Sequence, residues 1–275
     1  LGMVSFTGST AVGRGVVAAR QGNLKRVHLE LGGKAANIVF ADADLTAAVN
    51  GSAFAIFRVQ GQACIAGSRL LLHRDIADEF IDSFVALARS IRVGDPKDPG
   101  TELGPLTSPG HRDRVLGHLK LAVDQGATVL TGGGQPADPD LAGGCYLEPT
   151  VVAADPQARI ACEEVFGPVV TVHTFADEAE ALRMSNAVDY GLGAGLWTRD
   201  LSRAHRFARE LRAGMVWVNT FDATDVTAGP IARVRHASTR PDSPLRPDAP
   251  GHAYHPVVAV VVPALEITKS VHSAF

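Results

Sequence analysis

Strand-like and helix-like segments alternate along most of this 275-residue chain, with short connections between them. The expected strands are residues 3–7, 27–30, 37–40, 68–73, 127–130, 169–175, 194–197 and 216–219. The expected helices are residues 8–22, 42–57, 75–91, 111–125, 177–187 and 201–211. Such alternation is typical of an α/β fold with a mainly parallel sheet.

The helix expected from residue 75 shows how this pattern is recognised. Its apolar positions Ile76, Phe80, Phe84, Leu87 and Ile91 recur at helical spacing. They form a single stripe that one face of a helix can bury against a sheet.

The charge balance and the apolar runs exclude two classes of partner. Lys and Arg number 26 against 29 Asp and Glu, a formal net charge of −3, whereas nucleic-acid binders usually carry a basic excess. The apolar run 257–262 is far shorter than the roughly 20 residues of a membrane span. The first residues lack the charged and apolar regions of a secretion signal. We therefore expect a cytoplasmic chain, beginning inside a fold, that binds neither nucleic acid nor membrane.

The cysteines and histidines predict no metal site. Cys64, Cys145 and Cys162 are an odd number without a C-x-x-C pair, which fits a reducing compartment. No His or Cys cluster has the spacing of metal ligands, and the H-E-x-x-H motif is absent.

Residues 6–14 form the first candidate binding site. A strand, then Gly8 and Ser9, then a helix containing Gly13 leaves free amides and the positive end of a helix dipole at one turn, which can hold a phosphate. The motif is neither G-x-G-x-x-G nor a P-loop. A well-capped turn with no ligand has the same sequence.

Two further segments hold candidate reactive groups. Glu30 ends an apolar strand, where partial burial would raise its pKa toward that of a general base; a rim carboxylate paired with Lys34 is the alternative. Cys64 lies between glycine-bearing turns whose amides can stabilise a thiolate and an oxyanion, although most free cysteines are small buried hydrophobes. Cys145 and Cys162 have no such surroundings.

The fourth candidate segment is residues 163–168, two acids followed by an aromatic residue, a glycine and a proline. The carboxylate of Glu164 can hold sugar hydroxyls while the ring of Phe166 packs on a flat ligand. A solvated surface turn would have a similar sequence.

Taken in order, five segments resemble the NAD(P)-dependent aldehyde dehydrogenase superfamily. They read Phe-Thr-Gly-Ser-Thr, Leu-Glu-Leu-Gly-Gly-Lys, Gly-Gln-x-Cys, Glu-Glu-Val-Phe-Gly-Pro and Val-Trp-Val-Asn, and the resemblance runs from residue 1 to about residue 224. It implies an aldehyde dehydrogenase-like catalytic domain, a parallel sheet with flanking helices, plus a remnant of the Rossmann-like cofactor domain.

The resemblance also assigns roles to residues. It implies that Cys64 is the nucleophile that forms a thiohemiacetal and then a thioester with a small aldehyde, and that Glu30 is the general base for thioester hydrolysis. Residues that match cofactor-binding positions for NAD or NADP are Gly8, Ser9, Gly13, Leu31, Glu164 and Phe166.

The chain departs from the superfamily in three places. Members of the superfamily carry a long portion before the position of Leu1, and we expect this chain to lack what that portion supplies, a Lys for the adenosine ribose and an Asn of the oxyanion hole. Before the nucleophile, the usual Phe-Asn-x-Gly-Gln is replaced by residues 58–62, so that Arg58 places a charge near a normally apolar substrate tunnel. After Thr220 the sequence diverges, and residues 229–256 are rich in Pro, Arg and His and poorly suited to a packed core.

These features predict three parts and leave three functions open. We expect residues 1–32 to be the cofactor-domain remnant, residues 33–228 the catalytic domain, and residues 229–275 a divergent tail in place of the usual oligomerisation segment. Intact relatives form homo-oligomers; here residues 257–262 would be an unpaired strand that favours heterogeneous assembly. The function is NAD(P)-dependent aldehyde oxidation, a catalytically silent binding or assembly module, or cofactor-independent thiol esterase activity.

Overall fold

The computed structural model describes residues 2–22, 24–222, 231–233 and 258–261. The strands are β1 (Met3–Thr7), β2 (Arg26–Glu30), β3 (Ala36–Val39), β4 (Arg69–His73), β5 (Thr128–Thr131), β6 (Thr150–Ala153), β7 (Val169–Phe175), β8 (Gly193–Trp197), β9 (Met215–Val218), β10 (Ile231–Arg233) and β11 (Val258–Val261). The α-helices are α1 (Thr10–Ala19), α2 (Leu45–Phe57), α3 (Ala77–Ser90), α4 (Pro109–Asp124), α5 (Arg159–Cys162), α6 (Glu178–Ser185) and α7 (Leu201–Glu210).

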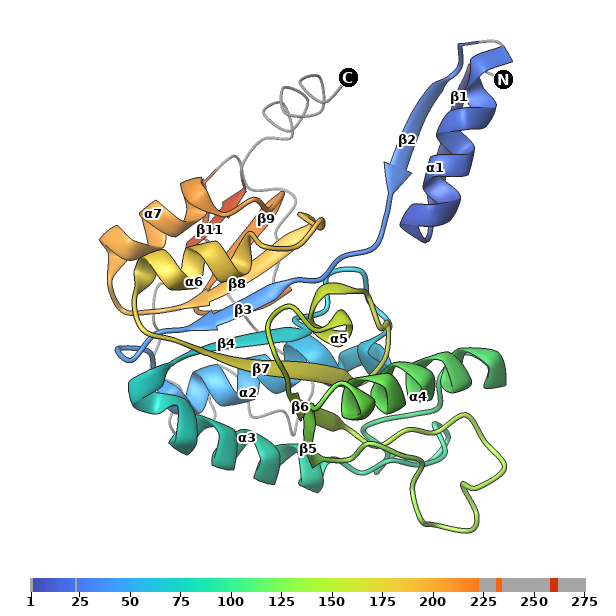
Figure 1. Cartoon of the computed structure of the whole chain (residues 1–275), viewed down its shortest axis with the longest axis vertical. Coiled ribbons are helices and arrows are strands. Elements are labelled where there is room, and N and C mark those ends of the chain that lie inside the picture. The colour runs from blue at the N-terminus through green and yellow to red at the C-terminus, as the bar shows by residue number, and fades with distance from the viewer. Residues whose placement is uncertain (1, 23, 223–230, 234–257, 262–275) are drawn as a thin grey trace.

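A large sheet forms the body of the molecule (Figure 1). Its strand order is β10-β11-β9-β8-β3-β4-β7-β6-β5. The strands from β9 to β6 in this order are all parallel to their neighbours, whereas β5, β11 and β10 pair antiparallel at the two edges. The predicted α/β fold with a mainly parallel sheet is confirmed.

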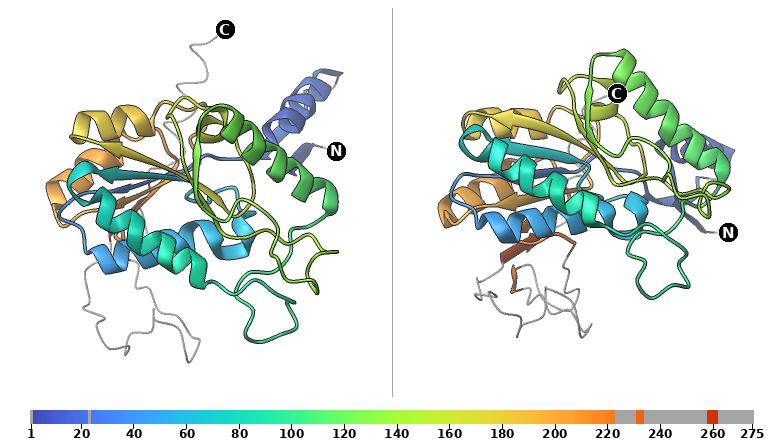
Figure 2. Two further views of the ribbon diagram at one scale, coloured as in Figure 1. Left: turned by 60° about the horizontal axis from the view of Figure 1, so that its bottom comes forward. Right: turned by 90° about the horizontal axis from the view of Figure 1, so that it is seen from below.

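Helices cover both faces of this sheet (Figure 2). Because side chains alternate along a strand, neighbouring residues of β3 enter different cores. Val39 packs in the cluster with α2 and α3, while Ile38 packs in the cluster with α6 and α7. Ile38 lies in register with Leu71 of β4 and Leu196 of β8, which extends the second cluster across three strands.

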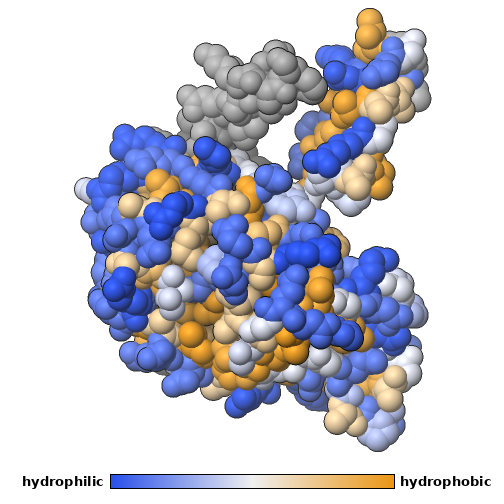
Figure 3. Space-filling view, viewed as in Figure 1, coloured by the Kyte–Doolittle hydropathy of each residue, from blue (hydrophilic) through white to orange (hydrophobic). Residues whose placement is uncertain are grey.

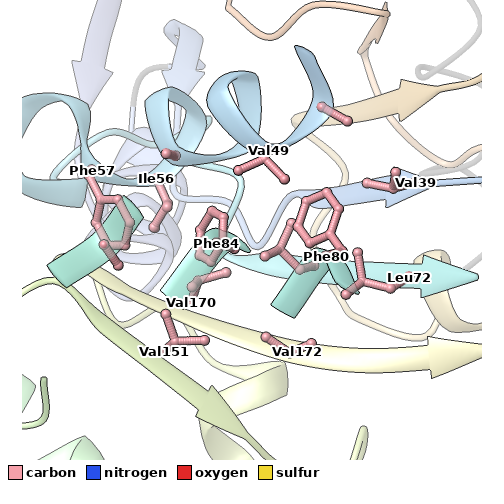
Figure 4. Close-up of a cluster of buried hydrophobic side chains, with 14 of the residues drawn as sticks. Val39, Val49, Ile56, Phe57, Leu72, Phe80, Phe84, Val151, Val170 and Val172 are labelled. Atoms are coloured by element: carbon pink, nitrogen blue, oxygen red, sulfur yellow. The ribbon is translucent and has the colours of Figure 1, made fainter. Parts of the chain in front are cut away.

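The first core is built on the stripe predicted for the helix at residues 75–91 (Figure 4). Phe80 and Phe84 of α3 are fully buried and stack on each other, and Phe57 at the end of α2 stacks on Phe84. Burying each phenylalanine ring contributes about 2–3 kcal/mol. The stripe therefore fixes α2 and α3 together under the sheet.

A second, two-stranded sheet stands apart from the body. In it β1 and β2 pair in parallel and α1 packs beside them (Figure 1). Of α1 only Gly13 is buried, and Met3, Val12, Val17 and Leu24 are exposed apolar residues of this small unit, which Figure 3 shows projecting from the body. Two strands and one helix leave most side chains open, since a two-stranded sheet has little core.

Several short elements were not predicted from the sequence. β6 and α5 have four residues each, and β10 has three. The apolar run 257–262 does contain a strand, but the expectation that it is unpaired is wrong, because β11 pairs with both β9 and β10. The rest of the segment 229–275, expected to be a divergent tail, lies outside the described residues. No helix within the described ranges is long and apolar enough to cross a membrane.

A buried polar bridge joins the central strands to α2, and it generates a stability prediction. Asn37 donates to Ser52 Oγ at 2.8 Å and accepts from Trp197 Nε1 at 2.8 Å, with no exposure to solvent. Asn37→Ala leaves both partners buried without this bond, so we expect the free energy of unfolding to fall by about 2–4 kcal/mol in urea titrations. Asp124→Ala, which removes an exposed pair with Lys120, serves as the control and should change it by less than about 0.5 kcal/mol. Equal losses in the two variants would contradict this interpretation.

Candidate active site

The candidate residues gather where the two sheets meet end to end. Strands β3, β4 and β7 are adjacent and parallel, so their amino-terminal ends lie at one edge of the large sheet. The segments 31–35, 58–68 and 163–168 lead directly into these three ends. Segment 31–35 also begins at the carboxyl end of β2. The edge is therefore bordered by Glu30 on one side and by the loops of Cys64 and Glu164 on the other.

A hydrogen bond between distant segments fixes the connection from β2 to β3. The Gly33 amide donates to Glu164 Oε1 at 3.1 Å. A methyl group at Gly32 would overlap the Glu164 carboxylate, so glycine permits this close approach. Burial raises the pKa of Glu164, while the Gly33 amide and the charge of Lys34 act in the opposite direction. The Glu164 carboxylate is thus held in position by residues 31–35, the connector between β2 and β3. The same carboxylate is a candidate group for binding a ligand.

Glycines also bring the Cys64 loop against its neighbours. A methyl group at Gly33 would overlap the Cys64 carbonyl, and one at Gly61 would overlap the Gly167 carbonyl. Gly61 has φ = +66°, a conformation that only glycine adopts without cost. A glycine at position 61 is therefore needed for the turn to fit against Gly167. The three segments touch, and Cys64 is half-buried among them.

The environment of the thiol opposes ionisation overall. Burial raises the pKa of Cys64, and the charges of Glu164 and Glu30 raise it further. The backbone amides of Cys64 and Ile65 act in the other direction, as expected for a turn that can stabilise a thiolate. The amides are present, but they do not outweigh burial and the two carboxylates.

Glu30 differs from its predicted environment. Its side chain is 51% exposed, so the expected partial burial is wrong. Its partner is His28, with Nε2 3.2 Å from Glu30 Oε1, in place of Lys34, which is only 2% exposed. The reason is that β2 has a single neighbouring strand and stands outside both main cores, which leaves alternate side chains of this strand open to solvent.

Lys34 and Arg69 form a buried cationic pair that the sequence did not reveal. The Arg69 guanidinium donates to the carbonyls of Lys34 at 3.0 Å, Met184 at 2.9 Å and Ser185 at 2.8 Å, and so fixes the end of the connector. Burial, aided by the charge of Arg69, lowers the pKa of Lys34 to about 7. A single Lys after two glycines carries no sequence signal for such burial.

Phe166 has a strained backbone that a second unpredicted residue supports. Its φ is +58°, which is unfavourable for a side chain of this size, and the residue is 37% exposed. The Phe166 carbonyl accepts from His111 Nε2 at 2.6 Å, while Arg114 donates to His111 Nδ1 at 3.2 Å. This arrangement fixes one histidine tautomer and holds the aromatic ring near the Cys64 loop.

The turn between β1 and α1 lies at an exposed helix N-terminus that could hold an anion. Gly8 and Ser9 are exposed at the amino end of α1, Ser9 caps the helix by accepting from the Val12 amide, and Gly8 donates to the Glu30 carbonyl at 3.0 Å. The helix dipole and amides at this end suit an anion. Gly13 lies against Leu31, where a methyl group would meet Leu31 Cδ2 at 2.6 Å. The turn and the connector are therefore in contact.

The remaining predictions for side-chain chemistry concern cysteines and metals. Cys145 packs at the margin of the core around α4, and Cys162 donates to the Pro156 carbonyl at 3.4 Å, both away from the glycine turn of Cys64. No group of three or more His, Cys, Asp or Glu side chains capable of holding a metal ion occurs in the part of the chain that the structure describes.

Comparison with known proteins gives consistent matches. The model of the aldehyde dehydrogenase family matches residues 1–236. The 5-carboxymethyl-2-hydroxymuconate semialdehyde dehydrogenase of Escherichia coli is 46% identical over 221 residues, which cover 79% of this chain and 47% of that protein. Betaine aldehyde dehydrogenase of Bacillus subtilis strain 168 is 43% identical over 220 residues, 80% of this chain and 45% of that relative.

The solved structures agree. The structure of PnpE, a Pseudomonas sp. WBC-3 protein, in complex with nicotinamide adenine dinucleotide matches with a TM-score of 0.82 and 58% identity, over 83% of this chain and 47% of that one. The chain spans about half the length of the curated relatives it matches.

The lowered pKa of Lys34 predicts a specific pH dependence of stability. Between about pH 7 and pH 10.5 the unfolded chain keeps a proton that the folded chain has released, so the free energy of unfolding should rise with pH. In urea titrations from pH 7.5 to 9.5, the free energy of unfolding of the parent should rise by roughly 1 kcal/mol per pH unit. Lys34→Met removes the titrating group and should lack this rise. Lys120→Met, at an exposed position, should retain the rise. Parallel profiles for the parent and Lys34→Met would disprove the assignment.

Proposed function

Because the chain belongs to the aldehyde dehydrogenase family, we propose that it oxidises a small aldehyde to a carboxylic acid with NAD(P)+, using Cys64 as the nucleophile. The observation that carries the proposal is the meeting of three segments at one sheet edge, where Cys64 lies within the electrostatic influence of Glu30 and Glu164. A thiol, a carboxylate at the end of β2 and a neighbouring anion-binding turn are the groups that such a reaction requires.

Cys64 is proposed to add to the carbonyl carbon of the aldehyde and form a thiohemiacetal. The amides of Cys64 and Ile65, which favour negative charge on the sulfur, are suited to stabilising the charge that develops nearby. Burial and the two carboxylates raise the pKa of the Cys64 thiol, so the thiol must lose its proton before it attacks. The rate of thiohemiacetal formation should therefore rise with pH.

Glu30 is proposed to act as the general base for hydrolysis of the Cys64 thioester. Its exposed side chain can contact water directly, and its charge is one of those that raise the pKa of the Cys64 thiol. A water molecule deprotonated by Glu30 attacks the thioester carbon, releasing the carboxylic acid and the thiolate.

The residues around the connector fit NAD(P)+. The turn of Gly8 and Ser9 before α1 would hold the pyrophosphate, with Gly13 and Leu31 beneath it. Glu164 and Phe166, which lie beside the Cys64 loop, would hold the ribose and pack against the nicotinamide. The chemistry that NAD(P)+ would supply there is acceptance of the hydride that converts the thiohemiacetal into a thioester.

Two other functions would use the same fold differently. A catalytically silent module would reduce no NAD+ with any aldehyde, and a thiol esterase would hydrolyse esters through Cys64 without NAD+. The turn between β1 and α1 favours the dehydrogenase, since an esterase has no need of an anion-binding turn for a dinucleotide.

Glu30→Gln provides the sharpest test of the proposed mechanism. We expect the variant to release NADH in a burst of about one equivalent per chain without steady turnover, because thioester forms but is not hydrolysed. Stopped-flow absorbance at the NADH band with a simple aldehyde measures both phases. Cys64→Ser should abolish burst and turnover, while Cys162→Ser should leave them unchanged. The base assignment fails if Glu30→Gln turns over at the rate of the parent chain.

A further inference from the structure

The turn of Phe166 and Gly167 is wedged between α4 and the Cys64 loop. A methyl group at Gly61 would overlap the Gly167 carbonyl, and one at Gly167 would meet Val115 Cγ2 of α4 at 2.9 Å. Phe166 has φ = +58°, a conformation that a bulky side chain adopts only when its surroundings impose it. Contacts from the neighbouring elements therefore hold this residue in place.

His111 of α4 supplies the polar contact that holds Phe166. Its Nε2 donates to the Phe166 carbonyl at 2.6 Å, the one hydrogen bond that this carbonyl accepts from any residue the structure describes. The two rings also meet edge to face, with centroids 5.9 Å apart. His111 is 7% exposed, so the bond is shielded from water. Losing the bond would leave the carbonyl without its partner and allow the strained turn to relax.

Arg114 and Ser108 fix the orientation of this histidine. Arg114 Nη2 donates to His111 Nδ1 at 3.2 Å. An arginine can only donate, so Nδ1 is the accepting nitrogen and the hydrogen lies on Nε2, which faces the carbonyl. Ser108, the N-cap of α4, accepts from the His111 amide at 3.3 Å. The first turn of α4 thus presents one tautomer in one orientation.

The same end of α4 borders a cleft beside the candidate nucleophile. Residues of the connector, the Cys64 loop and the turn of Phe166 line this cleft: Gly33, Gly61, Ala63, Glu164 and Phe166. Ala63 directly precedes Cys64. Just before α4, the Thr107 amide donates to Gln62 Oε1 at 3.1 Å, so the Cys64 loop is also held from this end of the helix. Two walls of the cleft are therefore attached to one helix terminus.

We propose that His111, oriented by Arg114, is a positioning residue that sets the ring of Phe166 against the nicotinamide of the bound dinucleotide. The inference rests on the proposed function, which assigns Phe166 to the nicotinamide. His111 itself contacts neither cofactor nor substrate; it acts through the Phe166 carbonyl. Without this bond the ring no longer presents a fixed face to a flat ligand, and the nicotinamide contributes less to binding.

ADP-ribose tests the proposal because it is NAD+ without the nicotinamide. Calorimetry on the full chain gives the ratio of the two dissociation constants, ADP-ribose over NAD+, and the 2′-phosphates of both ligands give the same ratio for NADP+. We expect His111→Ala to lower this ratio by about two- to tenfold, the effect of one aromatic contact, with the affinity for ADP-ribose nearly unchanged. His111→Gln keeps an N–H donor and should restore most of the loss. His205→Ala, at an exposed position of α7, is the matched control and should leave the ratio unchanged.

Hydrogen exchange supplies a second measurement that needs no ligand. Amide exchange in a peptide covering residues 163–169 should be faster in His111→Ala than in the parent chain, because the turn opens more often. His205→Ala should show the exchange of the parent. Should His111→Ala fail to fold, Arg114→Met, which frees the tautomer of His111, takes its place with the same expected direction in both measurements.

Three results would overturn the proposal and leave the proposed function standing: an unchanged ratio, equal losses of affinity for NAD+ and ADP-ribose, or unchanged exchange of residues 163–169 in the variant. A failure of the proposed function looks different. In that case the parent chain binds NAD+ and NADP+ no more tightly than their ADP-ribose counterparts, which removes the nicotinamide site and the role of His111 with it.

Discussion

The bond from the Gly33 amide to the Glu164 carboxylate is the contact on which the arrangement of the site depends. It joins residues 131 positions apart in the sequence and fixes the connector that leaves the small sheet and enters the large one. On one side of this bond Leu31 packs on Gly13 of α1; on the other side Arg69 holds the Lys34 carbonyl. The connector is thereby fixed at both ends and in its centre.

Glycine makes this contact possible. Residues 32 and 33 approach a carboxylate and a carbonyl too closely for any side chain, and Gly61 does the same on the neighbouring loop. The consequence is that Cys64, Glu164 and Phe166 occupy the amino-terminal edge of a parallel sheet. Ligands of open α/β sheets usually lie at the carboxyl edge. In this molecule the strand whose carboxyl end faces the candidate residues is β2 of the small sheet. Glu30 and the turn between β1 and α1 lie at that end.

The sequence predicted the large elements well and the details of the site less well. Long periodic segments, such as α3 with Phe80 and Phe84, are specified by their own pattern, and strands such as β7 have β-branched runs. β6 and α5 are too short to carry a period, and only pairing with neighbours or packing against α4 defines them.

Within the site, motifs identified residues but not their environments. Lys34 was weighed as an exposed partner of Glu30, yet it is buried, and its carbonyl is bonded by Arg69, which is 35 residues away and carries no signal of its own. His111 supports Phe166 across 55 positions through a backbone carbonyl, a contact that no local pattern encodes. The sequence left two environments open for Glu30, partial burial or a rim position beside Lys34. Its side chain lies exposed beside His28, because burial requires neighbouring elements that β2 does not have.

The proposed convergence of Cys64, Glu30 and Glu164 on one site can be tested directly. The pH profile of Cys64 alkylation by iodoacetamide reports the ionisation of the thiol, which both carboxylates oppose. Glu30→Gln and Glu164→Gln should each move the profile to lower pH, because each removes a charge that opposes ionisation of the thiol. Glu163→Gln, which removes a carboxylate paired with Arg159, should leave the profile in place. Profiles that stay unmoved in both Glu30→Gln and Glu164→Gln would contradict a shared site.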